Sequence, residues 1–148
     1  TNTMHKVSEA VTAQIRIPLL HIADPTAVKV KSKGIQKIAL LGTRFTMEED
    51  FYKGRLRREH ELAVIVPDDA EMDVIHEVIY GELCLGKILQ PSRERYLTIV
   101  DRLIQKGAQG VILGCTEIGL LIKNGDSPVP FFDTTAIHAE AAVDFALS

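Results

Sequence analysis

The chain of 148 residues is long enough for one domain with its own hydrophobic core, and its net charge at neutral pH is −3. This charge, without basic clusters interleaved with aromatic residues, argues against nucleic acid and anionic membrane surfaces as partners. The apolar runs are too short to span a membrane and two cysteines make no disulfide framework, so we expect a soluble, cytoplasmic protein.

Hydrophobic periodicity and turn residues predict strands and helices that alternate along the chain. The expected strands are the apolar runs 17–22, 37–43, 62–67, 110–113 and 128–132. The expected helices are 5–15, capped by Asn2 or Thr3, then 24–33, 46–58, capped by Thr46, 69–83, 91–106, 117–122, and a final helix after residues 133–135. Such alternation indicates an α/β fold in which helices cover both faces of a parallel sheet.

Two of the predicted strands end in the same way, with a glycine followed by residues that carry hydroxyl groups. Gly42 precedes Thr43 and Thr46, and Gly114 precedes Cys115 and Thr116. Each glycine permits a tight turn, and exposed N–H groups near a helix start bind carboxylate or phosphate. Ligands bind at the carboxyl ends of strands in open α/β sheets, so these segments predict a site for a small anion. Each threonine could also simply cap a helix.

Cys115 is the strongest candidate for a reactive side chain. It follows a strand end and lies beside the start of a helix, a position whose field favours the thiolate form. Cys84 lies between two leucines and is interpreted as a buried apolar residue. Glu117 could act as a base, contact a substrate amine, or serve only as a first-turn carboxylate of the short helix.

The histidines are scattered along the chain without metal-ligand spacing, so no metal site is predicted. We expect His60 and His76 to be solvated, whereas His21 and His138 could face the edge of the site. The sequence has no GxGxxG or P-loop motif, which argues against dinucleotides and nucleoside triphosphates as ligands.

Four segments resemble the aspartate/glutamate racemase family, the amino-acid racemases that work without pyridoxal phosphate. Residues 111–121, with their Gly-Cys-Thr-Glu core, resemble the family's second cysteine motif. Residues 40–47 resemble its G-T-x-x-T-M strand end, and residues 132–135 fit its closing stretch. Residues 1–5 resemble those that directly follow the first catalytic cysteine, in a C-x-N-T-x-H setting. The segments stand in the family's order and extend over the whole chain.

The resemblance implies a flavodoxin-like lobe of a two-lobe enzyme. Residues 1–148 would form the second lobe together with the C-terminal strand and helix, and the first lobe is absent from the sequence. Thr1 is not a methionine start, and the family's first cysteine would stand immediately before it. We therefore expect the chain to be the C-terminal part of a longer protein and to be inactive by itself. The resemblance also implies that the full-length protein is a homodimer.

The activity that the resemblance implies is inversion of an amino acid at Cα without a cofactor. Inversion needs two acid/base groups on opposite faces of the carbon, and Cys115 would be one of them. The residues that would bind the amino-acid substrate are Thr1, Asn2, Thr3, Thr116, Glu117, Thr43 and Thr46. The choice of amino acid depends largely on the opposite lobe and cannot be derived from this chain.

Two other classes of function remain open from the residues alone. The chain could be a non-catalytic module that binds small anions or amino acids on a flavodoxin-like sheet. It could also be a hydrolase or isomerase that uses Cys115 as a nucleophile. The latter needs a histidine or aspartate partner, and no local spacing supplies one.

Overall fold

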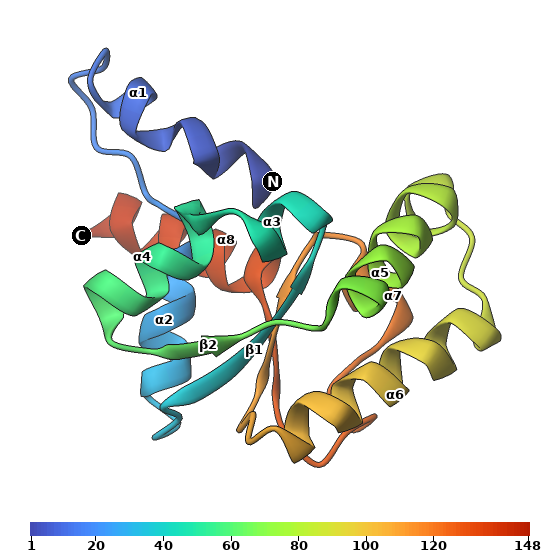
Figure 1. Cartoon of the computed structure of the whole chain (residues 1–148). Coiled ribbons are helices and arrows are strands. Elements are labelled where there is room, and N and C mark those ends of the chain that lie inside the picture. Colours follow the sequence, from blue (N-terminus) through green and yellow to red (C-terminus); the bar gives the residue numbers. More distant parts are fainter.

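The computed structural model describes all residues 1–148, which form a parallel sheet with helices on both faces (Figure 1). The four strands are hydrogen-bonded in the order β2-β1-β3-β4. Their bounds are β1 Lys37–Gly42, β2 Ala63–Ile65, β3 Val111–Gly114 and β4 Phe131–Asp133. The α/β class and the two covered faces expected from the sequence are confirmed.

Helices α2, α4 and α8 cover one face of the sheet, and α5, α6 and α7 cover the other (Figure 1). No helix is both long and apolar enough to cross a membrane. The helices are η1 Thr3–Val7, α1 Ser8–Thr12, α2 Ala23–Lys31, α3 Arg44–Glu48, α4 Asp50–His60, α5 Asp69–Gly81, η2 Leu83–Leu85, α6 Gln90–Gln105, α7 Ile118–Leu121 and α8 Thr134–Leu147, where η denotes a 3₁₀ helix.

The apolar runs of the strands divide between two hydrophobic cores. Along β1, Ala39 and Leu41 belong to the core under α5 and α6, whereas Ile38 and Leu40 belong to the core under α2 and α4. This division follows from the alternation of side chains along a strand. A strand buried on both faces has a continuous apolar run in its sequence, as β1 and β3 do.

The central pair of strands ends in two glycines at the same level. Gly42 of β1 is paired with Gly114 of β3, so the two strand ends predicted to share one sheet edge do so. The backbones are close at this level. A Cβ atom on Gly114 would lie 2.7 Å from the carbonyl oxygen of Leu41, and one on Gly42 would lie 3.0 Å from that of Gly114.

The predicted strand at residues 17–22 is wrong. No strand pairs there, and the side chain of Ile17 is 72% exposed. The segment is an irregular connection from α1 to α2, and only its end at His21 and Ile22 is buried. Pro18 has no backbone N–H group and cannot donate a hydrogen bond to a neighbouring strand. The apolar composition of the segment was therefore not enough to make it a strand.

Several helix boundaries also differ from the expected ones. The side chain of Thr43, not Thr46, caps α3, and the extended backbone of Glu49 separates α3 from α4. The expected helix 5–15 is η1 followed by the short α1, and neither Asn2 nor Thr3 caps it with its side chain. These polar side chains bond to distant parts of the chain instead.

The close backbone approach at the end of β3 makes Gly114 intolerant of a side chain. We expect Gly114→Ala to lower the free energy of unfolding by about 2 kcal/mol, because the new methyl group must displace backbone atoms. Gly81→Ala is the matched control, since a Cβ atom there meets nothing within 4 Å. Urea unfolding of both variants measures the difference, and equal losses at the two positions would contradict this account.

Candidate active site

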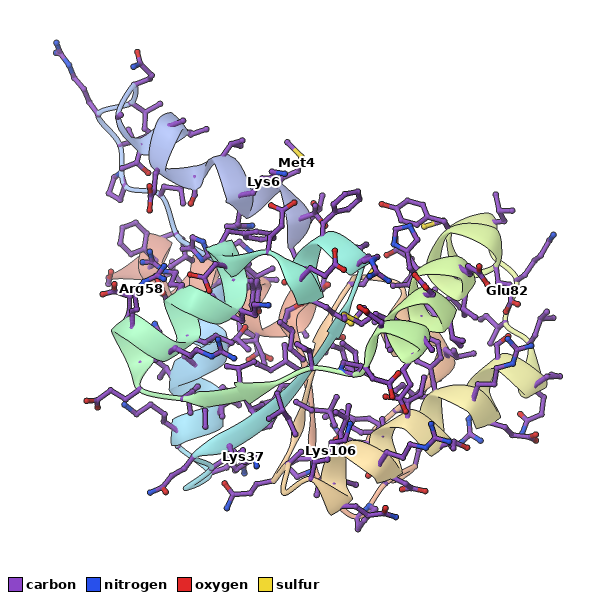
Figure 2. The ribbon with its side chains drawn as sticks, in the orientation of Figure 1. Met4, Lys6, Lys37, Arg58, Glu82 and Lys106 are labelled. Atoms are coloured by element: carbon purple, nitrogen blue, oxygen red, sulfur yellow. The ribbon has the colours of Figure 1, made fainter.

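A cavity of about 370 Å³ lies at the carboxyl ends of β1 and β3. Figure 2 shows Met4 on the N-terminal segment at this end of the molecule, with Lys37 and Lys106 at the opposite end. The cavity is lined by Thr1, Asn2, Thr3, Met4, Thr43, Ile79, Tyr80, Cys84, Gly114, Cys115, Thr116 and Glu117. All the predicted site residues except Thr46 therefore line one cavity, although they come from three distant segments.

Three threonine hydroxyl groups join the N-terminal segment to the end of β1. The Oγ1 atom of Thr3 lies 3.1 Å from that of Thr43 and 3.2 Å from that of Thr46. The hydroxyl groups of Thr43 and Thr46 are 3.2 Å apart. Thr46 is fully buried and does not line the cavity, so its contribution to the site is to support Thr3 and Thr43.

Two further contacts hold the N-terminal segment over the sheet. The side-chain amide of Asn2 donates to the hydroxyl group of Thr134 at 3.0 Å, and Lys6 pairs with Glu49 at 3.0 Å. Asn2 is only 4% exposed, and its Oδ1 atom is buried without a hydrogen-bond partner. Asn2 thus lines the cavity and carries a buried acceptor that no group of the protein satisfies.

The thiol of Cys115 donates a hydrogen bond to Oε2 of Glu117 at 3.0 Å. Burial, followed by this hydrogen bond, raises the pKa of Cys115 to about 12, whereas the bond from the thiol lowers the pKa of Glu117. The expected preference of Cys115 for the thiolate form is therefore wrong. The short helix α7 does not offset the cost of placing a thiolate beside a carboxylate.

Cys84 was expected to be buried, and this expectation is wrong. It is exposed on η2 and lines the same cavity as Cys115. Its neighbours explain the error, because Leu83 is buried while Leu85 is 64% exposed. A short 3₁₀ turn follows neither of the periodicities on which sequence reasoning depends, so no pattern could have placed Cys84 in the site.

The expectation that His60 and His76 are solvated is also wrong. Both are only partly exposed, and each has a hydrogen-bond partner. His60 lies 2.9 Å from a carboxylate oxygen of Asp24, and Nδ1 of His76 accepts from the backbone N–H of Arg44 at 3.2 Å. Both histidines therefore stabilise contacts between segments.

The remaining histidines, His5, His21 and His138, lie close together and do not line the cavity. The ring of His5 lies 4.6 Å from that of His21 and 5.9 Å from that of His138. Burial lowers the pKa of His21 to about 4, so its ring is neutral at neutral pH. No group of three or more His, Cys, Asp or Glu side chains is placed to hold a metal ion.

Comparison with known proteins identifies relatives of the chain. The family model for Asp/Glu/Hydantoin racemases matches residues 1–142. The crystal structure of a proposed Asp/Glu racemase from Yersinia pestis is 55% identical, with a TM-score of 0.95 over 100% of this chain and 64% of that one. An aspartate racemase homologue from Pyrococcus horikoshii is 36% identical, with a TM-score of 0.89 over 100% of this chain and 65% of that one.

A broad specificity amino-acid racemase from Bacillus subtilis is 22% identical over 147 residues, which are 99% of this chain and 63% of that protein. The chain thus spans slightly less than two thirds of the length of these three relatives. The family match covers nearly all of the chain and includes every residue that lines the cavity. This chain therefore belongs to the Asp/Glu/Hydantoin racemase family.

Proposed function

We propose that this chain supplies one half of the active site of an amino-acid racemase that inverts Cα without a cofactor. The observation that carries the proposal is the composition of the cavity. It joins the thiol of Cys115, the carboxylate of Glu117, the unpartnered Oδ1 of Asn2 and the hydroxyl groups of threonines. The family membership supports the same activity.

The polar groups of the cavity complement a zwitterion better than an inorganic anion. Glu117 and Asn2 Oδ1 are acceptors, which suit an ammonium group, and the hydroxyl groups of Thr3, Thr43 and Thr116 can donate to a carboxylate. No Lys, Arg or His side chain lines the cavity, so no cationic side chain there would balance the charge of a phosphate or sulfate. This favours an amino acid over the small-anion module that the sequence also allowed.

Cys115 is proposed to deliver a proton to one face of Cα and to remove one in the opposite direction of reaction. Because burial and Glu117 raise its pKa to about 12, the thiol of Cys115 holds its proton at neutral pH. After the transfer, the thiolate would lie beside the carboxylate of Glu117, an unfavourable pair of like charges. A substrate ammonium group near Glu117 would offset this repulsion and bring the thiol pKa into a useful range.

The second acid/base group is proposed to come from outside this chain. Cys84 lies on η2, which packs against α7 directly after the Cys115 loop, so the two cysteines belong to adjoining segments. We do not expect two thiols on adjoining segments to stand on opposite faces of one carbon. We therefore propose that residues 1–148 form the second of two lobes and do not racemise alone. We also expect the full-length enzyme to be a cytoplasmic homodimer.

Exchange at Cα tests the proposed activity. In D₂O, the full-length protein should invert aspartate, glutamate or a neutral amino acid with deuterium incorporation at Cα, followed by NMR and chiral chromatography. Cys115→Ser should reduce inversion by roughly 100-fold or more, because a general acid/base contributes at least that factor. Cys84→Ser is the matched control and should retain activity.

Residues 1–148 alone should show no inversion in the same assay. Absence of exchange with all three substrate types in the full-length protein would refute the racemase proposal. Full activity of Cys115→Ser, with an unchanged thermal unfolding midpoint in both cysteine variants, would refute the role of Cys115.

Alkylation of Cys115 tests how Glu117 sets the state of the thiol. In full-length protein that carries Cys84→Ser, Glu117→Gln should lower the pKa of Cys115, because it removes a neighbouring negative charge. Iodoacetamide at neutral pH should then modify Cys115 about tenfold faster, as measured by mass spectrometry of its peptide. Glu140→Gln, on the exposed side of α8, is the control. An unchanged or slower rate in Glu117→Gln would contradict the assignment.

A further inference from the structure

A chain of two hydrogen bonds connects Asn2 to β3 through Thr134. The side-chain Nδ2 of Asn2 donates to Oγ1 of Thr134 at 3.0 Å, and that hydroxyl group donates to the carbonyl oxygen of Leu113 at 2.9 Å. A carbonyl oxygen can only accept, so the single hydroxyl hydrogen of Thr134 is committed to Leu113. The hydroxyl oxygen can then only accept from Asn2.

This commitment fixes the orientation of the Asn2 amide. Its NH₂ group must face Thr134, because its oxygen would find no donor there. The Oδ1 atom is consequently directed away from Thr134 and has no partner, although it is buried and Asn2 lines the cavity. Leaving a buried acceptor unpaired is unfavourable, and a donor on a bound ligand would remove this cost.

The fold brings Thr134 next to the carbonyl group of Leu113, and its hydroxyl group is not needed to cap α8. Leu113 of β3 is paired with Asp133 of β4, so the next residue, Thr134, lies beside the Leu113 carbonyl group. Thr134 is the first residue of α8 and is fully buried. The side chain of Asp133 caps α8 by accepting from the N–H groups of Thr135 and Ala136, so Thr134 is not needed as a cap.

We propose that Thr134 is a positioning residue of the racemase. It holds the Asn2 amide in the orientation that presents Oδ1 to the α-ammonium group of the substrate, without contacting the substrate itself. This inference rests on the proposed function. It also assigns a chemical preference to this part of the cavity, which should favour a carboxylate that carries a neighbouring ammonium group over one that lacks it.

Substitution of Thr134 in the full-length protein tests the inference. Thr134→Val keeps the shape of the side chain but removes the hydroxyl group, so the amide of Asn2 is free to rotate. The KM for the amino acid should rise about tenfold, as expected for the loss of one hydrogen bond to a charged group, with a smaller change in kcat. Thr134→Ser keeps the hydroxyl group and should restore the KM to within about twofold.

A desamino analogue separates positioning from a merely structural role. The carboxylic acid that lacks the α-amino group should inhibit Thr134→Val and the wild type equally well. Equal weakening of the amino acid and the analogue, an unchanged KM in Thr134→Val, or a Thr134→Ser variant as impaired as Thr134→Val would each overturn the inference. A wild-type protein without racemisation would instead refute the proposed function.

A neutron structure of the wild-type protein tests the amide orientation without any substitution. The two hydrogens of the Asn2 side chain should lie on the side of Thr134, and the hydroxyl hydrogen of Thr134 should lie toward Leu113. Amide hydrogens on the cavity side would overturn the inference, whatever the stability of the variants.

Discussion

The site depends on the pairing of Gly42 with Gly114 at the last level of the β1–β3 ladder. Neither residue has a side chain, and a Cβ atom would lie 3.0 Å from a backbone oxygen at Gly42 and 2.7 Å from one at Gly114. The segments that follow, with Thr43 and Cys115, therefore begin side by side at one edge of the sheet. Parallel strands place such ends together in any α/β fold, but here the close approach also brings their hydroxyl and thiol groups into one cavity.

The elements of the core could be predicted from the sequence because their periodicity is imposed by burial. β1 and β3 are buried on both faces, and α5 and α6 carry apolar stripes toward one core. The run 17–22 is also mostly apolar, yet it forms no strand and pairs with no strand of the sheet. Composition reports that a segment is apolar, whereas strand formation also requires a partner strand at that place, which local sequence does not encode.

Most of the polar residues of the site could be predicted, but not the interactions that they make. The resemblance to a family identified residues from three segments that line one cavity, and the structure brings them together. The raised pKa of Cys115 depends on the distance to Glu117 and on burial, neither of which a sequence states. The entry of Cys84 into the cavity depends on a 3₁₀ turn, and the anchoring of Asn2 depends on Thr134, 132 residues away.

We propose that two features of the cavity prepare it for an amino-acid substrate. Burial and the neighbouring carboxylate of Glu117 keep its thiol protonated, and its buried asparagine has an acceptor that nothing in the protein satisfies. Both features favour an ammonium group as the missing partner, since it would satisfy Asn2 and neutralise Glu117. In the proposed chemistry, the ammonium group of the substrate therefore supplies the positive charge that the site lacks.

The most direct test is a crystal structure of the full-length protein with an amino acid bound. The account predicts the ammonium nitrogen within hydrogen-bonding distance of Asn2 Oδ1 and Glu117. It also predicts Cα beside the Sγ atom of Cys115, at about 3–3.5 Å, the separation of a reactive complex. An amino acid bound elsewhere, or with its carboxylate against Asn2 Oδ1 and Glu117, would contradict the account.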